Sequence, residues 1–437
     1  MIRIALLAAA LLANPPAHAS EPPGLGAALN ALSKEQKFSG AVVIRGPDGV
    51  RFARGYGLAD PSTGRRFTID TPVDGASLAK PVTAAAILLL HREGRIKLDV
   101  PVRRYVLEYP HSETTVRHLL SHSAGLPDYD AFEPITGKAT GAMLRDLGAR
   151  LTPPSFAPGS AFAYCNLCYD TLAVIVERVS GLTYQQFIDR HLFGPAGVRS
   201  SKLRPLRLTD WRGRAIGYRR DASGGIKLND SWEGEAFYGG GNIAFTAADL
   251  ARWGGAWADG RYAPVRTRAT QPAVIAGRKS GLTWGNWYCV KGRRRCHYLG
   301  HHEGFHNFLY WDSDRRISIA MVSNNTLDSR IHQRLQRALV AFAEGRAVIA
   351  RRELDQPLAS EPVKPGRYKL PNGETLNLFA EVEQSMTLEF GDLHYAAFRA
   401  GPVMRYVPGL DLYLAGTSDG HLLWLSLYED LIGQAAR

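Results

Sequence analysis

Residues 75–90 read GASLAKPVTAAAILLL, so the hydroxyl of Ser77 and the amine of Lys80 lie three positions apart at the start of an apolar run. If a helix begins near Ser77, side chains at i and i+3 share one face, which brings the two groups within hydrogen-bonding reach. A neighbouring base activates a serine hydroxyl as a nucleophile. Unpaired N–H groups at a helix N-terminus also favour an oxyanion nearby. The stretch therefore predicts a nucleophilic serine, to be tested against the rest of the chain.

The length and charge of the chain limit its class. With 437 residues, 45% hydrophobic and 22% charged, it is longer than one average domain and predicts a large catalytic unit with a smaller module. Its net charge of +12 would suit an anionic surface such as a cell wall, or serve solubility alone. No nucleic-acid-binding motif accompanies the charge, so we expect no nucleic-acid partner.

The first residues have the layout of a secretory signal. Arg3 gives a positive start, residues 4–13 form a short apolar run, and Ala17-His18-Ala19 is an A-x-A cleavage site. We expect a signal peptide over residues 1–19, cleavage after Ala19, and a periplasmic or secreted protein.

Four cysteines would meet an oxidising compartment after export. Cys289 and Cys296 flank a basic tip, and their spacing fits a disulfide that closes a hairpin. Cys165 and Cys168 could pair with each other, or one of them could pair elsewhere. A zinc site made from these four cysteines with His297 is a weaker alternative.

The order of elements predicts an α+β fold. Strand patterns cover residues 38–46, 51–58, 308–311 and 317–322, whereas helical patterns cover residues 80–93, 115–121, 169–179, 184–192, 246–255 and 328–344. This order suits a mixed antiparallel sheet flanked by helices, with an inserted helical lobe, over residues 20–352. After a proline-containing linker, short alternating runs predict a small C-terminal antiparallel β domain over residues 361–437.

Three further segments carry polar groups suited to a site with Ser77. Tyr164 and Asn166 precede a helix and offer a phenol and an amide. The second segment is Gly300-His301-His302-Glu303-Gly304, where strand alternation places the two histidines on opposite faces. The third is the glycine run 239–241, which would let the backbone approach a ligand closely.

With these segments in order, the chain resembles the serine β-lactamase and D-alanyl-D-alanine carboxypeptidase superfamily, in the branch of class C β-lactamases, D-aminopeptidases and esterases. The resemblance runs from about residue 38 to residue 325. It rests on Ser77-x-x-Lys80, on residues 115–127 (TVRHLLSHSAGLP), on Tyr164-x-Asn166, on residues 239–243 (GGGNI), and on His302-Glu303-Gly304 as the third motif. Residues 366–373 (GRYKLPNG) resemble the lipocalin-like modules appended to many of these hydrolases.

The resemblance implies an acyl-enzyme mechanism without a metal or organic cofactor. Ser77 would attack a carbonyl, while Lys80 and Tyr164 would share proton transfer. Asn166 would hold Lys80 and a substrate amide. The last assignments concern the third motif: His302 and Gly304 would bind substrate, and the N–H groups of Ser77 and Phe305 would form the oxyanion hole.

The third motif departs from the family pattern, because His302 stands where a lysine normally grips the carboxylate of a β-lactam. Histidine carries less charge at neutral pH, so we expect small esters or D-amino-acyl peptides as substrates. The alternatives are a β-lactamase, or a penicillin-binding sensor that acylates and turns over slowly. The register of this motif is open by one residue, since His301 could take the place of His302.

Overall fold

The computed structural model describes residues 24–126, 154–205, 208–220, 225–228, 230, 238–290, 294–302, 304–326, 329–345, 362–369, 375–379, 385–390, 393–399, 404–407, 412–416, 422–426 and 431–435. The expected signal peptide over residues 1–19 lies outside these residues. Within them, no helix is long and apolar enough to cross a membrane.

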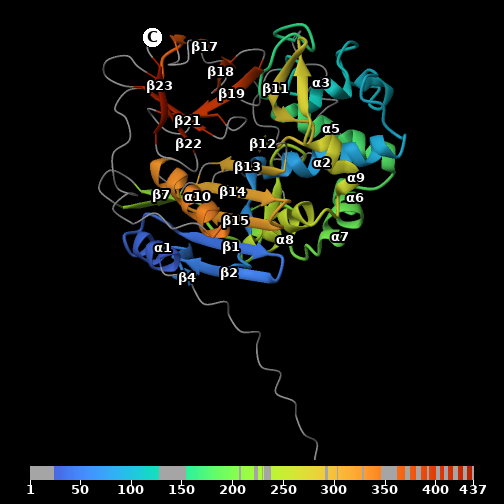
Figure 1. Ribbon diagram of the computed structural model, residues 1–437. Coiled ribbons are helices and arrows are strands. Elements are labelled where there is room, and N and C mark those ends of the chain that lie inside the picture. The colour runs from blue at the N-terminus through green and yellow to red at the C-terminus, as the bar shows by residue number, and fades with distance from the viewer. Residues whose placement is uncertain are drawn as a thin grey trace, which may run out of the picture.

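An antiparallel sheet forms the centre of the hydrolase part (Figure 1). Its spatial order is β2-β1-β15-β14-β13-β12-β11. The strands are β1 (Gly40–Gly46), β2 (Gly49–Tyr56), β11 (Arg278–Thr283), β12 (Tyr288–Val290), β13 (Arg295–His302), β14 (Phe305–Asp312) and β15 (Ile317–Ser323). The first strands therefore pair with strands from near residue 320, as the sequence predicts for a mixed α+β fold.

Helices cover both faces of this sheet and extend into a lobe beside it (Figure 1). They are α1 (Leu25–Lys34), α2 (Ala79–Arg92), α3 (Val116–Leu120), α5 (Asn166–Ser180), α6 (Tyr184–Ile188), α7 (Gly194–Ala196), α8 (Ala247–Ala258), α9 (Ala263–Ala269) and α10 (Ser329–Ala343). Single turns are η1 (Ala76–Leu78), η2 (Val102–Arg104), η5 (Leu208–Asp210) and the π-helical η4 (Asp189–Phe193).

The remaining strands are short or lie in the C-terminal part. The short ones are β3 (Leu58–Asp60), β4 (Arg65–Arg66), β5 (Val73–Asp74), β6 (Lys202–Leu203), β7 (Tyr218–Arg220), β8 (Ile226–Leu228), β9 (Ile243–Phe245) and β10 (Pro272–Ile275). The C-terminal ones are β16 (Gly366–Lys369), β17 (Thr375–Leu378), β18 (Ser385–Phe390), β19 (Leu393–Arg399), β20 (Met404–Val407), β21 (Leu412–Gly416), β22 (Leu422–Ser426) and β23 (Leu431–Ala435).

The C-terminal strands pair with one another in antiparallel fashion, and β19 adds a parallel pairing to β11 of the hydrolase sheet. Their antiparallel pairing agrees with the alternating runs of the sequence. The domain boundaries expected at residues 352 and 361 stay predictions.

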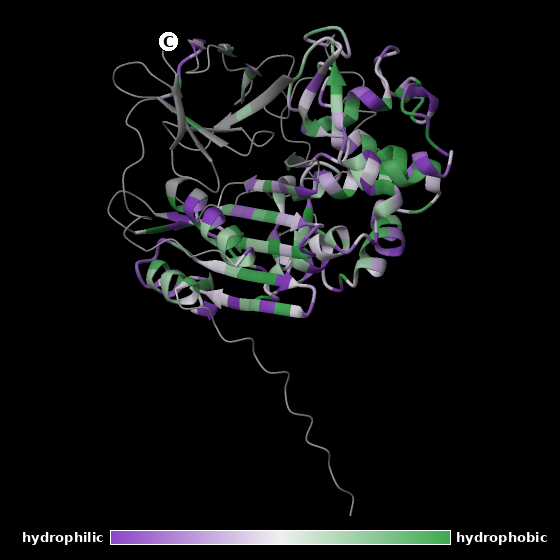
Figure 2. Ribbon diagram, in the orientation of Figure 1, coloured by the Kyte–Doolittle hydropathy of each residue, from purple (hydrophilic) through white to green (hydrophobic). Residues whose placement is uncertain are grey.

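Strand alternation divides the apolar core into two layers. Val42 packs with α1 and α10 on one face of the sheet, whereas its neighbour Val43 packs in the layer that includes α2, α5 and α8. Successive side chains of a strand point to opposite faces, which explains why neighbours join different layers. Figure 2 shows hydrophobic residues concentrated along the sheet and in the helices around α2 and α5.

Helix α2 owes its central position to its composition. Its alanines and leucines have high helix propensity, and Pro81 lies in the first turn, where its missing N–H costs little. Residues 79–90 are all buried, so other parts of the protein pack around the helix on every side, including at Lys80 and Thr83. The sequence thus places the Ser77–Lys80 pair at the end of a rigid, buried element.

Candidate active site

Ser77 lies in the η1 turn that leads into α2, rather than in the α-helix itself. The preceding Ala76 has a φ of 46°, a left-handed conformation that costs about 1–3 kcal/mol in a residue other than glycine. Asp74 stabilises the turn, since its Oδ1 accepts the Ala76 N–H at 2.8 Å. Its Oδ2 accepts from Arg204 at 2.6 Å, and both side chains are about 95% buried, with exposures of 5% and 4%. A buried ion pair therefore supports the strained turn before Ser77.

Lys80 is completely buried and donates three hydrogen bonds. Its Nζ lies 3.1 Å from Ser77 Oγ, 2.6 Å from Asn166 Oδ1 and 2.6 Å from the Gly240 carbonyl oxygen. Three acceptors match the three hydrogens of an ammonium group. The structure thus brings together Ser77, Lys80 and Asn166, which the sequence placed in one site.

The glycine run packs closely against helix α5. A Cβ on Gly239 would lie 2.0 Å from the Tyr169 carbonyl oxygen, so only glycine fits there. The N–H of Gly240 donates to Asp170 Oδ1 at 2.8 Å, which orients the peptide whose carbonyl accepts from Lys80. In this structure the run positions the lysine, whereas the sequence predicted an approach to a ligand.

Tyr164 also contacts Ser77, because its phenol donates to Ser77 Oγ at 2.8 Å. Its ring stacks on His122 with centroids 4.6 Å apart and planes at 15°. The Nζ of Lys80 lies 4.7 Å from the ring centroid, a cation–π geometry. Tyr164 is thus fixed by packing on its ring as well as by its hydroxyl.

A chain of hydrogen bonds through His122, Asn286 and Tyr298 leads to the Tyr164 phenol. The Cys165 N–H donates to His122 Nδ1 at 3.0 Å, so Nδ1 is the acceptor of the neutral ring and its single N–H is on Nε2. That N–H donates to Asn286 Oδ1 at 3.2 Å. Asn286 Nδ2 donates to the Tyr298 hydroxyl at 2.8 Å, and that hydroxyl lies 3.4 Å from the hydroxyl of Tyr164. Burial raises the pKa of Tyr298 well above its usual value, so Tyr298 keeps a proton to share with Tyr164.

His122 makes the stability of the fold depend on pH. Burial, together with the charge of Lys80, lowers the pKa of His122 from 6.5 to about 3. Between these values the unfolded chain binds a proton that the folded chain does not. The stabilisation is therefore complete above pH 6.5 and is lost as the pH falls towards 3, by about 1.4 kcal/mol per pH unit.

We expect His122→Asn to remove only the share of this dependence that belongs to His122, since burial also lowers the pKa of His297, His306 and His332. Asparagine tolerates the φ of 54° at this position. The free energy of unfolding in urea, measured from pH 7.5 to pH 5, should fall more steeply for the wild-type protein than for the variant. Parallel pH profiles for the two proteins would contradict the assignment.

At Gly300, strand β13 passes close to the turn that carries Ser77. A Cβ on Gly300 would lie 2.2 Å from the Gly75 carbonyl oxygen, so glycine is needed for the strand to pass the turn. Positions 298, 300 and 302 share one strand face by alternation, and position 301 lies on the other. Between the two histidines that the sequence left open, position 302 therefore shares the face of Gly300. The roles predicted for His302 and Gly304 are not tested by these contacts.

The strand pairing indicates which way the backbone N–H groups near the site point. His306 of β14 exchanges hydrogen bonds with Ser323 Oγ, so its backbone groups face β15. Because backbone groups alternate along an antiparallel strand, those of Phe305 face β13 and its partner His302. His301 lies directly opposite His306, and its N–H points to the edge of β13 away from β14. Among the described residues of this hairpin, the N–H of Phe305 therefore points towards β13 and the N–H of His301 points away from β14.

Sequence reasoning missed Tyr298, His122 and Asn286. The sequence did contain a signal for Tyr298. Tyr298-x-Gly300 lies just before Gly304-Phe305 and offers a second possible position for the third motif. His122 lay within the recognised segment 115–127 without an assigned role. Asn286 had no local signal.

Both cysteine pairs form disulfides. Cys289 and Cys296 lie opposite each other on β12 and β13, which confirms the predicted hairpin closure. Cys165 pairs with Cys168 within its own motif, so the open alternative is resolved. Because all four sulfurs are bonded, the alternative of a cysteine zinc site is wrong. The Cys165–Cys168 disulfide fixes the start of α5, and its Cys165 lies between Tyr164 and Asn166 in the chain.

The chain belongs to the beta-lactamase family, since residues 25–342 match the model of the family Beta-lactamase. It is 25% identical over 432 residues to penicillin-binding protein 4* of Bacillus subtilis, covering 91% of this chain and 94% of the relative. It is 34% identical over 211 residues to esterase EstB of Burkholderia gladioli, covering 43% of this chain and 53% of the esterase. It is 27% identical over 317 residues to a D-aminopeptidase of Cereibacter sphaeroides, covering 69% of this chain and 60% of that enzyme. The chain thus spans less than two thirds of the last two relatives.

Solved structures show the same fold. The octameric penicillin-binding protein homologue of Pyrococcus abyssi superposes with a TM-score of 0.61 at 19% identity, covering 94% of this chain and 99% of that one. The D-amino acid amidase of Ochrobactrum anthropi gives 0.57 at 21% identity, covering 69% and 92%. The predicted β-lactamase/transpeptidase-like fold is confirmed, and membership of this family supports a serine hydrolase.

Proposed function

We propose that the protein hydrolyses small esters or D-amino-acyl amides and peptides through an acyl-enzyme on Ser77. The observation that carries the proposal is the contact of Ser77 Oγ with both Lys80 Nζ at 3.1 Å and the Tyr164 hydroxyl at 2.8 Å. A serine needs an adjacent base to act as a nucleophile, and this pair of contacts supplies candidates for that base. Relatives named as an esterase and a D-aminopeptidase support the substrate classes.

The proposed reaction starts once Tyr164 has released its phenolic proton to solvent; the Ser77 hydroxyl then donates to the phenolate oxygen and transfers its proton there as Ser77 Oγ attacks the substrate carbonyl. Lys80 lies beside both groups and stabilises the negative charge on the phenolate. Tyr164 then protonates the departing alkoxide or amine, which leaves an ester of Ser77. In the second half, Tyr164 removes a proton from water, and the resulting hydroxide attacks the carbonyl of the Ser77 ester. The bond between Ser77 Oγ and the acyl group breaks, the acid leaves, and Tyr164 returns the proton to Ser77.

In the same proposal, the third motif lies at Tyr298-Leu299-Gly300 instead of residues 302–304. Tyr298 is the β13 residue whose hydroxyl lies 3.4 Å from that of Tyr164, and Gly300 allows β13 to approach Gly75. The N–H groups of Ser77 and His301 would then form the oxyanion hole, which moves this role away from Phe305. His302 remains a candidate for substrate binding beyond the hole.

This register bears on the substrate. A neutral phenol at position 298 supplies no cation for the carboxylate of a β-lactam, and the Lys80 ammonium is already surrounded by three acceptors. The arrangement favours esters and amides that need no cation for a carboxylate beside the scissile bond over β-lactams. A β-lactamase and a slowly deacylating penicillin-binding protein remain the competing functions.

Mass spectrometry of the intact protein tests the proposal directly. The wild-type protein and Ser77→Ala are mixed with a p-nitrophenyl ester, a D-amino acid amide and a penicillin, and both adduct mass and product release are followed. We expect product from the ester or the amide with the wild-type protein, and neither adduct nor product with Ser77→Ala. A penicillin adduct that persists without turnover would favour the sensor, rapid penicillin hydrolysis would favour the β-lactamase, and full activity of Ser77→Ala would refute the site.

A further inference from the structure

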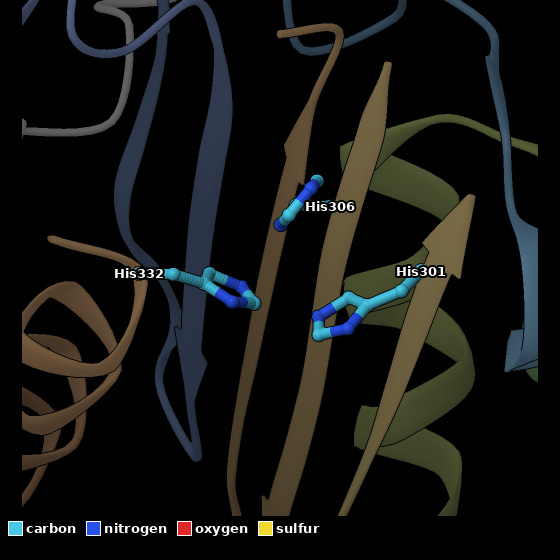
Figure 3. A group of neighbouring side chains, drawn as sticks. All are labelled: His301, His306 and His332. Carbon is cyan, nitrogen blue, oxygen red and sulfur yellow. The ribbon is translucent and has the colours of Figure 1, made fainter. Parts of the chain in front are cut away.

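Three histidines converge on the face of the sheet opposite Ser77. His301 of β13 and His306 of β14 are cross-strand partners, and His332 of α10 points at them from the helix that covers this face (Figure 3). Their candidate ligand nitrogens all lie within 4.8 Å of one another. The ring centroids are 4.8, 5.0 and 5.4 Å apart, so each imidazole is a neighbour of the other two.

The nitrogens of this cluster suit a metal ion better than a hydrogen-bond network. His306 Nδ1 is buried and has no hydrogen-bond partner, and such groups are rare without a missing ion or water. A neutral imidazole keeps a lone pair on one ring nitrogen for coordination, and each of the three histidines offers one such ligand atom. The amide nitrogen of Gln336 lies 3.2 Å from His332 Nε2 and gives that ring a polar neighbour.

We propose that His301, His306 and His332 bind one divalent transition-metal ion of the zinc, nickel or copper class. Imidazole suits these ions, and three protein ligands leave a fourth position for water. Metal–nitrogen bonds of 2.0–2.1 Å place tetrahedral ligand atoms about 3.4 Å apart, so the rings need only close slightly from their present separation. Solvent reaches the cluster at His301, which is exposed and gives the ion a path of entry.

Such an ion would join α10 to the β13–β14 hairpin. Position 301 lies directly behind the face that carries Tyr298 and Gly300, so the ion would fix the strand that lines the active site from its far side. The proposal departs from the sequence-based expectation of no metal. It does not depend on the proposed hydrolysis, because binding can be measured on its own.

The test uses the full chain after treatment with EDTA and removal of the chelator. We expect one equivalent of Zn²⁺ to bind in calorimetry, and Co²⁺ to give the visible absorption of a site with nitrogen ligands. His301→Asn and His332→Asn should each weaken Zn²⁺ binding by about tenfold or more, because even second-shell partners of a metal typically change affinity 10–100-fold.

The neighbouring histidine supplies a matched control. His302→Asn changes the next residue, on the other strand face, and should leave Zn²⁺ affinity and the Co²⁺ spectrum unchanged, as should His191→Asn of η4. If His332→Asn disturbs folding, as seen by circular dichroism, the exposed His301 variant still decides the question. Absence of stoichiometric binding, or equal binding by the wild-type protein and His301→Asn, would overturn the proposal. Loss of binding in His302→Asn alone would also overturn it.

Discussion

Lys80→Met is expected to reduce kcat/KM for the best ester or amide by about 10³-fold or more, since positioned proton-transfer groups contribute about 10²–10⁴-fold and this residue also stabilises charge. Methionine has nearly the same length but donates no hydrogen bond. Ser77 Oγ would lose the contact at 3.1 Å, while Asn166 Oδ1 and the Gly240 carbonyl would lose their donor. Steady-state hydrolysis and the rate of Ser77 acylation, read by intact mass, measure the effect.

The same substitution also tests how much the buried amine stabilises the fold. Each buried acceptor left without a donor costs about 1–3 kcal/mol, so a lower Tm is expected along with the lost activity. Lys202→Met, which changes an exposed lysine of β6, is the control and should alter neither. Activity of Lys80→Met within tenfold of the wild-type value, in protein that is folded at the assay temperature, would exclude Lys80 from the reaction.

Tyr164→Phe is expected to lower kcat by about 10²–10⁴-fold, the usual contribution of a general acid–base group. The variant removes the hydroxyl that lies 2.8 Å from Ser77 Oγ but keeps the ring that stacks on His122. The fold should therefore remain intact, with KM changed much less than kcat.

Tyr298→Phe distinguishes the contribution of Tyr164, the proposed base, from that of the neighbouring phenol of Tyr298. Its hydroxyl lies 3.4 Å from that of Tyr164 and does not contact Ser77 in the described hydrogen bonds. We expect a smaller loss, about tenfold in kcat, as befits one partner in a polar network. Equal losses in the two variants would indicate that the phenol pair acts as a unit, and a Tyr164→Phe enzyme with more than half of the wild-type kcat would remove Tyr164 from the mechanism.

The sequence predicted the parts of the site that follow local rules. Ser77 and Lys80 are three residues apart at the start of a helix, so their contact follows from helical geometry alone. The strands and helices around them were also predicted, since alternation and apolar density are local patterns. Tyr164 and Asn166 lie at the start of α5, where the sequence predicts a helix to begin, and the fold brings them to Ser77 and Lys80.

The third motif could not be fixed in this way. Which residue of β13 faces Ser77 depends on the strand register, and a shift along a strand moves every side chain. The register is set by the close approach of Gly300 to Gly75 and by pairing with β14, which are contacts between distant segments. Asn286 contacts Tyr298 and His122 only in the folded chain, so no spacing of residues in the sequence could have predicted its part in the site.

The bonds of Lys80 connect the reactivity of Ser77 to the completeness of folding. Two of them reach Asn166 and Gly240, which are 86 and 160 positions away along the chain. Contacts between such distant segments form only when most of the domain has assembled. A collapsed or partly folded chain would hold both Ser77 and Lys80 but lack the distant acceptors that orient the amine. The fraction of molecules that a covalent ester probe labels would therefore count native protein in a refolding mixture.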